Sequence, residues 1–285
     1  MNHRLLVTGG TGYLGSHLIK NSQTWTTHAT YFQSTPRRTD STTFHQCDLT
    51  NGEQTTQLIT SIKPTLIIHT ACSNKSAQEI SAIVPAASHL ARLARETGSK
   101  FIHLSTDLVF DGTSAPYYEE DIPCPLHPYG EAKSAAEQII STVCPDSIII
   151  RASLMYGIDP YDHQTRWLMQ GLESGNPIHL FTDEIRSPIW VENLAKAILE
   201  LSDISYSGIL HLAGPEAFNR WDFGMAILKL VKRHPTSNIQ PSTIAASGMI
   251  RPKNLALRIE KARKLLKTPF LSVLDVMRQL HGARS

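Results

Sequence analysis

The feature that most constrains the fold is a regular alternation of short apolar runs and amphipathic stretches in the first half of the chain. The apolar runs are rich in Val, Ile, Thr and aromatic residues, and they cover residues 4–9, 27–32, 65–71, 100–106 and 147–153. Strands buried on both faces have this composition. The stretches between them space apolar residues by three and four, as amphipathic helices do. The repetition predicts an α/β fold, a doubly wound parallel (Rossmann) sheet with helices on both faces.

After about residue 151 the alternation of apolar runs and amphipathic stretches becomes irregular. We expect helices over 190–202, 220–234, 255–267 and 271–282, and a strand over 208–214 that returns to the main sheet. The predicted organisation is a dinucleotide-binding domain over 1–150, joined by 187–213, and a smaller C-terminal substrate lobe over 151–186 and 214–285. That lobe is expected over the carboxyl edge of the sheet, where open α/β sheets bind ligands.

Composition excludes several classes of function. The chain has 27 Lys and Arg against 25 Asp and Glu, and this near-balance gives no reason to expect a nucleic-acid partner. No apolar run is long enough to cross a bilayer, and the first residues do not read as a signal peptide. We therefore expect a soluble, reduced, cytoplasmic protein with no membrane partner.

The cysteines and histidines give no metal signal. The four cysteines are far apart, form no CxxC pair and are expected to be small buried hydrophobes. None of the 13 histidines forms a metal-binding spacing, so no metal site is predicted. Four histidines lie in strand-like runs and are expected to be core or edge residues whose ring nitrogens have hydrogen-bond partners: His69, His103, His179 and His211.

Directly after the first apolar run, the sequence TGGTGYLG places glycines at positions 9, 10, 12 and 15. Glycine permits the sharp strand-to-helix turn, leaves room for a pyrophosphate and lets the helix pack closely on the strand. The phosphates then lie at the helix N-terminus and accept backbone N–H bonds. The alternative is a merely structural turn, but the strand–turn–helix context favours a dinucleotide site. It comprises Gly9, Thr11, Gly12, Tyr13, Leu14 and Gly15.

The second apolar run bears on which dinucleotide is bound. Enzymes that prefer NAD usually carry an Asp or Glu after this strand. Here no acid precedes Asp40, and Ser34, Arg37 and Arg38 follow the strand instead. Because guanidinium groups pair well with a dianionic phosphate, the sequence favours NADP(H) over NAD(H). The alternative for the arginines is a solvated basic loop.

Residues 128–141 read as a helix opened by Pro128, on which Tyr129 and Lys133 share one face. A phenol with a pKa near ~10 is a poor acid–base catalyst at neutral pH, but a neighbouring ammonium stabilises the phenolate. The run 100–106 ends in Ser105 and Thr106, either of which can donate a hydrogen bond to a carbonyl oxygen. With the glycine turn upstream, these residues indicate catalysis rather than an ordinary helix face.

The motifs TGGTGYLG, IIHTA, LSTDLVFDG, YGEAK, RASLMYG and EIRSPIWVENLAKAI together resemble those of extended short-chain dehydrogenase/reductases. STDLVFDG and the tail RPKNLAL are similar to the dTDP-4-dehydrorhamnose reductase-like, sugar nucleotide-binding subgroup. The resemblance implies a catalytic triad of Thr106, Tyr129 and Lys133, with Tyr129 and Lys133 also contacting the cofactor. It places the cofactor's adenine edge on Asp48 and Leu49, and the nicotinamide-side ribose on Ala71 and Cys72.

Two positions depart from the family pattern. Sugar-nucleotide dehydratases carry Asp-Glu after the Thr, whereas this chain has Asp107 and Leu108, and leucine cannot exchange a proton. Many relatives also carry an Asn that organises a proton-relay water, and Ile83 stands there. The first departure speaks against dehydration, and the second puts the relay in doubt.

The implied activity is NADPH-dependent reduction of a keto sugar nucleotide or similar keto compound, with Tyr129 as proton donor. The small-molecule substrate is expected to contact Arg186, Arg251 and Lys253, and the alternative for these cations is a structural role at the domain junction. The protein is expected to be a monomer or homodimer. One alternative is a non-catalytic NADP-binding regulatory subunit, because the β subunit of methionine adenosyltransferase belongs to the same subgroup. Another is a nucleotide-sugar epimerase, which uses the same triad.

Overall fold

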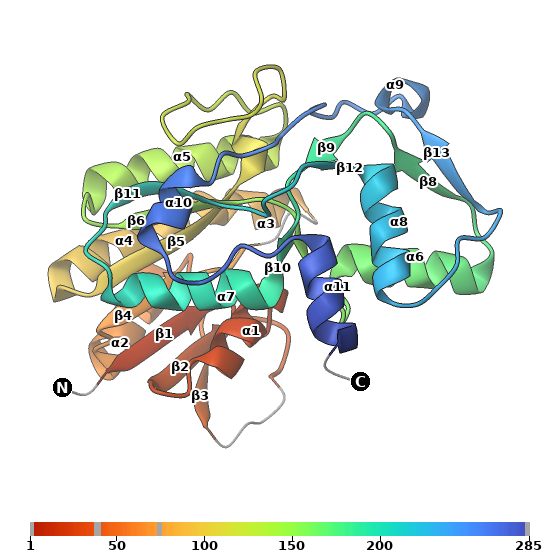
Figure 1. Cartoon of the computed structure of the whole chain (residues 1–285). Coiled ribbons are helices and arrows are strands. Elements are labelled where there is room, and N and C mark those ends of the chain that lie inside the picture. Colours follow the sequence, from red (N-terminus) through yellow and green to blue (C-terminus); the bar gives the residue numbers. More distant parts are fainter. Residues whose placement is uncertain (1–2, 37–40, 73–75, 283–285) are drawn as a thin grey trace. The chain divides into compact units, whose positions relative to one another are not determined.

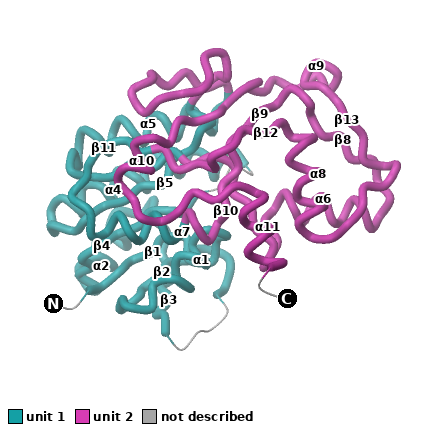
Figure 2. Tube along the Cα trace, in the orientation of Figure 1, with its two compact units in different colours: residues 1–109, 127–151, 195–210 teal, residues 110–126, 152–194, 211–285 magenta. Residues whose placement is uncertain are grey.

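The computed structural model describes residues 3–36, 41–72 and 76–282 (Figure 1). The chain forms two compact units, each made of three segments (Figure 2). Unit 1 comprises residues 1–109, 127–151 and 195–210, and unit 2 comprises residues 110–126, 152–194 and 211–285. The functional division drawn from the sequence, at residues 150, 187 and 213, stays a prediction.

Unit 1 is built around a seven-stranded parallel sheet with the order β11-β6-β5-β4-β1-β2-β3. Its strands are β1 (Arg4–Thr8), β2 (Thr26–Tyr31), β3 (Thr42–Gln46), β4 (Leu66–His69), β5 (Lys100–Thr106), β6 (Ile148–Ala152) and β11 (Gly208–Leu212). The predicted doubly wound Rossmann sheet is confirmed, as is the return of the strand after residue 208. The register pairs Thr8 with His69 and His69 with His103, so these residues form one row across β1, β4 and β5.

Helices cover both faces of this sheet (Figure 1). On one face, α2 (Gly52–Ile62), α4 (Ile83–Thr97) and α5 (Pro128–Val143) form a single apolar core with the strands. On the other face lie α1 (Tyr13–Asn21) and the C-terminal part of α7 (Val191–Glu200). Leu90 and Ile140 are fully buried in the first of these layers, and burial of each such side chain stabilises the fold by about 1.5–3 kcal/mol. Unit 1 also contains the short helices α3 (Ala77–Ser81), η1 (Asp107–Val109) and η2 (Leu201–Asp203).

Unit 2 combines short paired strands with helices. The strands pair as β7 (Met155–Tyr156) with β10 (Ile189–Trp190), β8 (Ile178–Phe181) with β13 (Ile239–Ser242), and β9 (Ile185–Arg186) with β12 (Phe218–Asn219). The helices are α6 (His163–Ser174), α8 (Arg220–Leu230), α9 (Ile244–Ser247), α10 (Glu260–Leu265) and α11 (Val273–Gly282). A separate apolar core packs Tyr156, Leu168 and Ile227 against Val276. Within the described residues, none of the helices is long and apolar enough to span a membrane.

Some sequence expectations were wrong. The helix expected over 255–267 begins only at Glu260, because the preceding backbone pairs with a distant segment instead of with itself. Leu257 forms a parallel bridge with Tyr117, whose carbonyl oxygen accepts the N–H of Arg258 at 2.8 Å. Burial was expected for all the cysteines, and it holds for Cys47 and Cys144. Cys72 and Cys124 are exposed, and all four are free thiols.

Candidate functional site

The turn between β1 and α1 has a shape that only glycine allows. Gly9 has φ +71°, in the left-handed region that favours glycine, and a Cβ there would lie 2.8 Å from Cα of Ala71. A Cβ on Gly15 would lie 2.2 Å from the carbonyl oxygen of Gly9. Helix α1 therefore begins closer to the strand than any larger residue would permit.

The first turn of α1 fits the pyrophosphate of a dinucleotide. The N-cap residue is Gly12, and no side chain caps the helix there. Backbone N–H groups and the positive end of the helix dipole therefore face outward, an arrangement that binds phosphate. Thr11 is exposed and Tyr13 is half-buried, whereas the side chain of Leu14 is buried, so only its backbone can face a ligand.

A cavity of about 640 Å³ adjoins this turn within unit 1. Its lining includes Gly10, Thr11, Ser34 and Pro36. Residues 31–36 contain no acid that could hold a ribose hydroxyl, and Ser34 is exposed. Arg37 and Arg38 lie outside the described residues, so their contact with the cofactor stays a prediction.

The remaining positions assigned to the cofactor lie at the carboxyl ends of β3 and β4. The carboxylate of Asp48 accepts hydrogen bonds from the backbone N–H and the hydroxyl of Thr50, at 2.9 and 2.7 Å, and the neighbouring Leu49 is buried. Ala71 donates its N–H to Thr8 at 3.3 Å, which ties this segment to β1 beside the glycine turn.

Helix α5 carries three polar residues at successive turns of one face, Tyr129, Lys133 and Glu137. Pro128 occupies its first turn, as predicted, where a missing N–H costs nothing. Tyr129 is half-buried, and its hydroxyl lies 3.8 Å from Sγ of Cys72. Lys133 is only 2% exposed. The structure therefore brings together Tyr129, Lys133 and Cys72 within unit 1.

The ammonium of Lys133 is held by two acceptors inside the protein. Its Nζ lies 3.1 Å from Nε2 of His103 and donates to the carbonyl oxygen of Leu104 at 2.5 Å. Burial lowers the pKa of Lys133 below its ordinary value, although Cys72 and Glu137 favour the charged form. Burial, and then Lys133 and His69, lower the pKa of His103 well below its ordinary value, so this imidazole is neutral.

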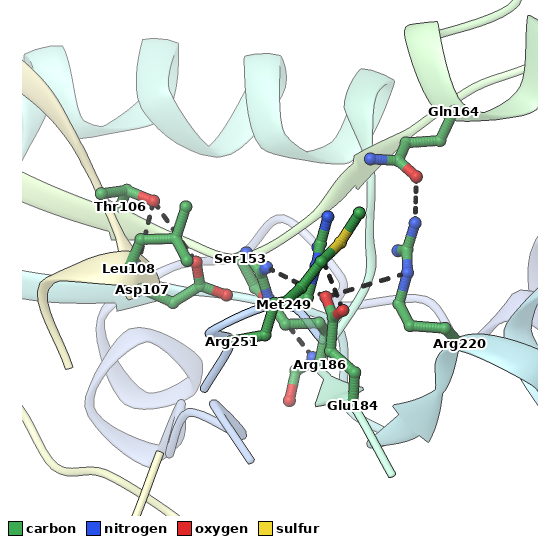
Figure 3. Close-up of polar contacts among 11 residues, drawn as sticks. Thr106, Asp107, Leu108, Ser153, Gln164, Glu184, Arg186, Arg220, Met249 and Arg251 are labelled. Carbon is green, nitrogen blue, oxygen red and sulfur yellow. Dashed lines mark hydrogen bonds and ion pairs between the residues drawn. The ribbon is translucent and has the colours of Figure 1, made fainter. Parts of the chain in front are cut away.

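The two hydroxyls at the end of β5 point to different partners. Ser105 donates to the carboxylate of Glu137, which occupies its hydroxyl inside the core. Thr106 lies 3.3 Å from the carboxylate of Asp107, and its oxygen accepts the N–H of Leu108 at 3.2 Å (Figure 3). Of the two candidates for a carbonyl-binding hydroxyl, Ser105 is thus already engaged with α5.

Glu137 also fixes α5 to β6. Its carboxylate accepts hydrogen bonds from Arg151, with Nη2 at 2.8 Å and Nε at 3.2 Å, and both side chains are buried. Sequence reasoning missed Glu137 as a partner of the site. Its spacing of four from Lys133 was the signal that could have found it.

In unit 2, the predicted substrate residues Arg186 and Arg251 gather around one buried carboxylate, that of Glu184 (Figure 3). Arg251 lies 3.1 Å from Glu184, and Arg186 lies 4.0 Å away. The side chain of Lys253 is exposed, and its backbone carbonyl accepts the N–H of Ile185.

A third arginine that the sequence did not single out joins this cluster. Arg220, at the start of α8, has Nε 4.0 Å from Glu184 and donates to the amide oxygen of Gln164 (Figure 3). Burial lowers its pKa to about 10, although Glu184 favours its charged form. Its Nη1 is buried and has no hydrogen-bond partner among the described residues. Three guanidinium groups therefore share one glutamate, and the cluster carries an excess of positive charge.

The family model described as RmlD substrate binding domain matches residues 3–275. The chain belongs to the RmlD family. The curated relatives of this RmlD family member include "Probable low-salt glycan biosynthesis reductase Agl14" of Haloferax volcanii. It is 33% identical over 239 residues, which cover 79% of each chain.

A second curated relative is methionine adenosyltransferase 2 subunit beta of Rattus norvegicus, 29% identical over 94% of this chain and 85% of that protein. Among solved structures, a hypothetical dTDP-4-dehydrorhamnose reductase from Sulfolobus tokodaii is 28% identical. It has a TM-score of 0.83 and covers 95% of this chain and 98% of that one. The Bacillus anthracis dTDP-4-dehydrorhamnose reductase, solved in complex with NADP, shares the fold at 24% identity, a TM-score of 0.81 and 99% coverage of both chains.

Proposed function

We propose that this RmlD family protein is an NADPH-dependent reductase of a keto sugar nucleotide or a similar keto compound. The observation that carries the proposal is the buried ammonium of Lys133, one helical turn from Tyr129, on a sheet whose glycine turn fits a dinucleotide. The relationship to the Haloferax reductase agrees with an oxidoreductase.

In this proposal, the glycine turn at Gly9, Gly12 and Gly15 would hold NADPH, which would supply the hydride that reduces the substrate carbonyl. Tyr129 protonates the developing alkoxide, and the positive charge of Lys133 lowers the pKa of the phenol toward the working range. Thr106 turns its hydroxyl from Asp107 to the carbonyl oxygen. Leu108 offers no group that exchanges a proton, so the site is suited to reduction rather than to elimination of water.

The excess positive charge around Glu184 favours an anionic substrate. We assign Arg186 and Arg251 to that anion and add Arg220, whose buried Nη1 is an unused donor among the described residues. Arginine binds phosphate in a planar, bidentate manner, which agrees with a nucleotide sugar. The exposed Lys253 is proposed to contribute charge at longer range.

The decisive test is Tyr129→Phe, which removes only the hydroxyl that supplies the proton. We expect single-turnover NADPH oxidation with keto sugar nucleotides to fall ~100- to 10,000-fold, with NADPH binding retained. The matched control is Tyr118→Phe, at an exposed tyrosine of unit 2, and it should behave as the parent. Lys133→Ala should reduce both turnover and cofactor affinity. In a separate titration, the parent protein should bind NADPH more tightly than NADH. If Tyr129→Phe reduces the ketone as fast as the parent, the catalytic assignment is wrong.

A second candidate function is a cofactor-binding regulatory subunit without turnover. The observations that favour it are the similarity to methionine adenosyltransferase 2 subunit beta over 94% of this chain and the buried Ile83 at the position of the relay residue. The same experiment separates the two functions. A parent protein that binds NADPH and oxidises it with none of the keto compounds, while a partner enzyme's activity responds to it, would establish the regulatory function.

A further inference from the structure

A buried polar row lies next to Lys133, and the proposed reaction does not use it. Thr8, His69 and His103 are neighbours across β1, β4 and β5, and all three are buried. Oγ1 of Thr8 lies 2.7 Å from Nδ1 of His69, and the rings of His69 and His103 are 5.1 Å apart. Polar groups inside a sheet are costly unless they are paired. Lys133 ends the row through its contact with His103.

The contact with Lys133 determines where His103 carries its proton. A charged lysine has three N–H donors and no acceptor, so Nε2 of His103 must accept and the ring proton must be on Nδ1. That Nδ1 is buried and has no hydrogen-bond partner among the described residues. His103 thus leaves its own donor unsatisfied while it satisfies a donor of Lys133. Such unsatisfied buried groups are rare in native proteins, which points to a role for the acceptor.

His103 and the carbonyl of Leu104 take two of the three N–H donors of Lys133. One donor remains for other partners.

We propose that His103 is a positioning residue: with the carbonyl of Leu104 it fixes the Lys133 ammonium so that its third N–H serves Tyr129 or a bound ribose. The inference rests on the proposed function, because that function assigns Lys133 to the reaction. His103 acts through Lys133 and does not itself touch the reacting atoms.

Other titratable groups also surround Lys133. Cys72, after β4, and Glu137, on α5, favour its charged form, and Glu137 is already paired with Arg151. Tyr129 lies one turn earlier on α5, and His69 lies beyond His103 on β4. None of these side chains makes a hydrogen bond to Nζ in the described structure, so the loss of His103 removes the single side-chain acceptor seen there.

The first test needs no substrate. Nitrogen-15 NMR of the imidazoles in the full-length protein should show His103 as the neutral Nδ1–H tautomer from about pH 5 to about pH 9, the range across which an ordinary histidine gains or loses its proton. In Lys133→Met this tautomer preference should be lost. An Nε2–H tautomer in the parent, ordinary titration near neutral pH, or a spectrum unchanged in Lys133→Met would overturn the proposal. The NMR test can be decided even if the protein reduces no keto compound. A failure to reduce any keto compound would count against the proposed function alone.

The second test compares His103→Leu, which removes the acceptor, with His103→Gln, which keeps one. The matched control is His69→Leu, another buried histidine that makes no contact with Nζ. With the best keto substrate, His103→Leu should lower kcat about tenfold and shift the alkaline limb of the pH profile upward by about one unit, because a looser ammonium lowers the phenol pKa less. KM should not change, and His103→Gln should largely restore both values. Equal effects of His103→Leu and His69→Leu would assign the residue to stability alone.

Discussion

Glu137→Ala tests whether the buried ion pair holds α5 to the sheet. The substitution leaves the guanidinium of Arg151 without its carboxylate, at a position where the arginine side chain is 1% exposed. It also removes the acceptor of the Ser105 hydroxyl. Breaking a buried pair by removal of one partner typically costs about 3–5 kcal/mol. We expect a loss of that size in the free energy of unfolding, which is a large fraction of the ~5–15 kcal/mol that stabilises a typical domain.

The assay is urea unfolding at neutral pH, followed by circular dichroism and tryptophan fluorescence and extrapolated to water. Glu96→Ala is the matched control, because it breaks an exposed pair with Arg92 on α4 whose side chains are 54% and 50% exposed. Such surface pairs contribute at most about 1 kcal/mol. If Glu137→Ala were no more destabilising than Glu96→Ala, the ion pair would not be what fixes α5, and the reasoning from burial would be refuted.

The remaining predictions concern pH and the glycine turn. Burial, followed by the charge of Lys133, lowers the pKa of His69 from 6.5 to about 3, so below pH 6.5 the unfolded chain binds a proton that the folded protein does not. Stability should therefore decrease as the pH falls through this range, by up to about 1.4 kcal/mol per unit from this residue, and His69→Leu should flatten the decrease in urea titrations. An unchanged slope would contradict the assignment. Gly15→Ala should destabilise the protein by about 1–3 kcal/mol, because its Cβ would lie 2.2 Å from a backbone oxygen. Gly12→Ala, where the closest contact is 3.0 Å, should mainly weaken NADPH binding in a titration, and equal stability of the two variants would count against the packing argument.

The parallel sheet was predictable because its strands are short apolar runs between amphipathic helices. The edge strand β3 was not predicted, because its sequence TTFHQ has one apolar residue in five and is partly exposed. Helix α10 was placed too early because Leu255, Leu257 and Ile259 are buried and apolar whether extended or helical. Apolar spacing cannot show that a segment pairs with a distant residue.

The site was partly predictable for a similar reason. Tyr129 and Lys133 share a helix face through local spacing alone, and the structure places Lys133 inside the protein. Adjacent strand residues point to opposite faces, so only the packing of α5 distinguishes Ser105 from Thr106. The cluster around Glu184 could not be predicted from local sequence spacing, because Arg220 and Arg251 lie far from Glu184 along the chain.

The segmented path of the chain has a consequence for biosynthesis. The outer strand β11 begins at Gly208, long after β6 ends at Ala152, so a nascent chain must carry β6 as an exposed sheet edge until residue 212 leaves the ribosome. Lys100 likewise meets its carbonyl acceptors only when Leu201, Ser202 and Ile204 have been translated. Unpaired strand edges invite aggregation. If translation stops between residues 152 and 212, the fragment made has a sheet that lacks its outer strand β11. The need for chaperones should therefore be highest while these residues are being translated.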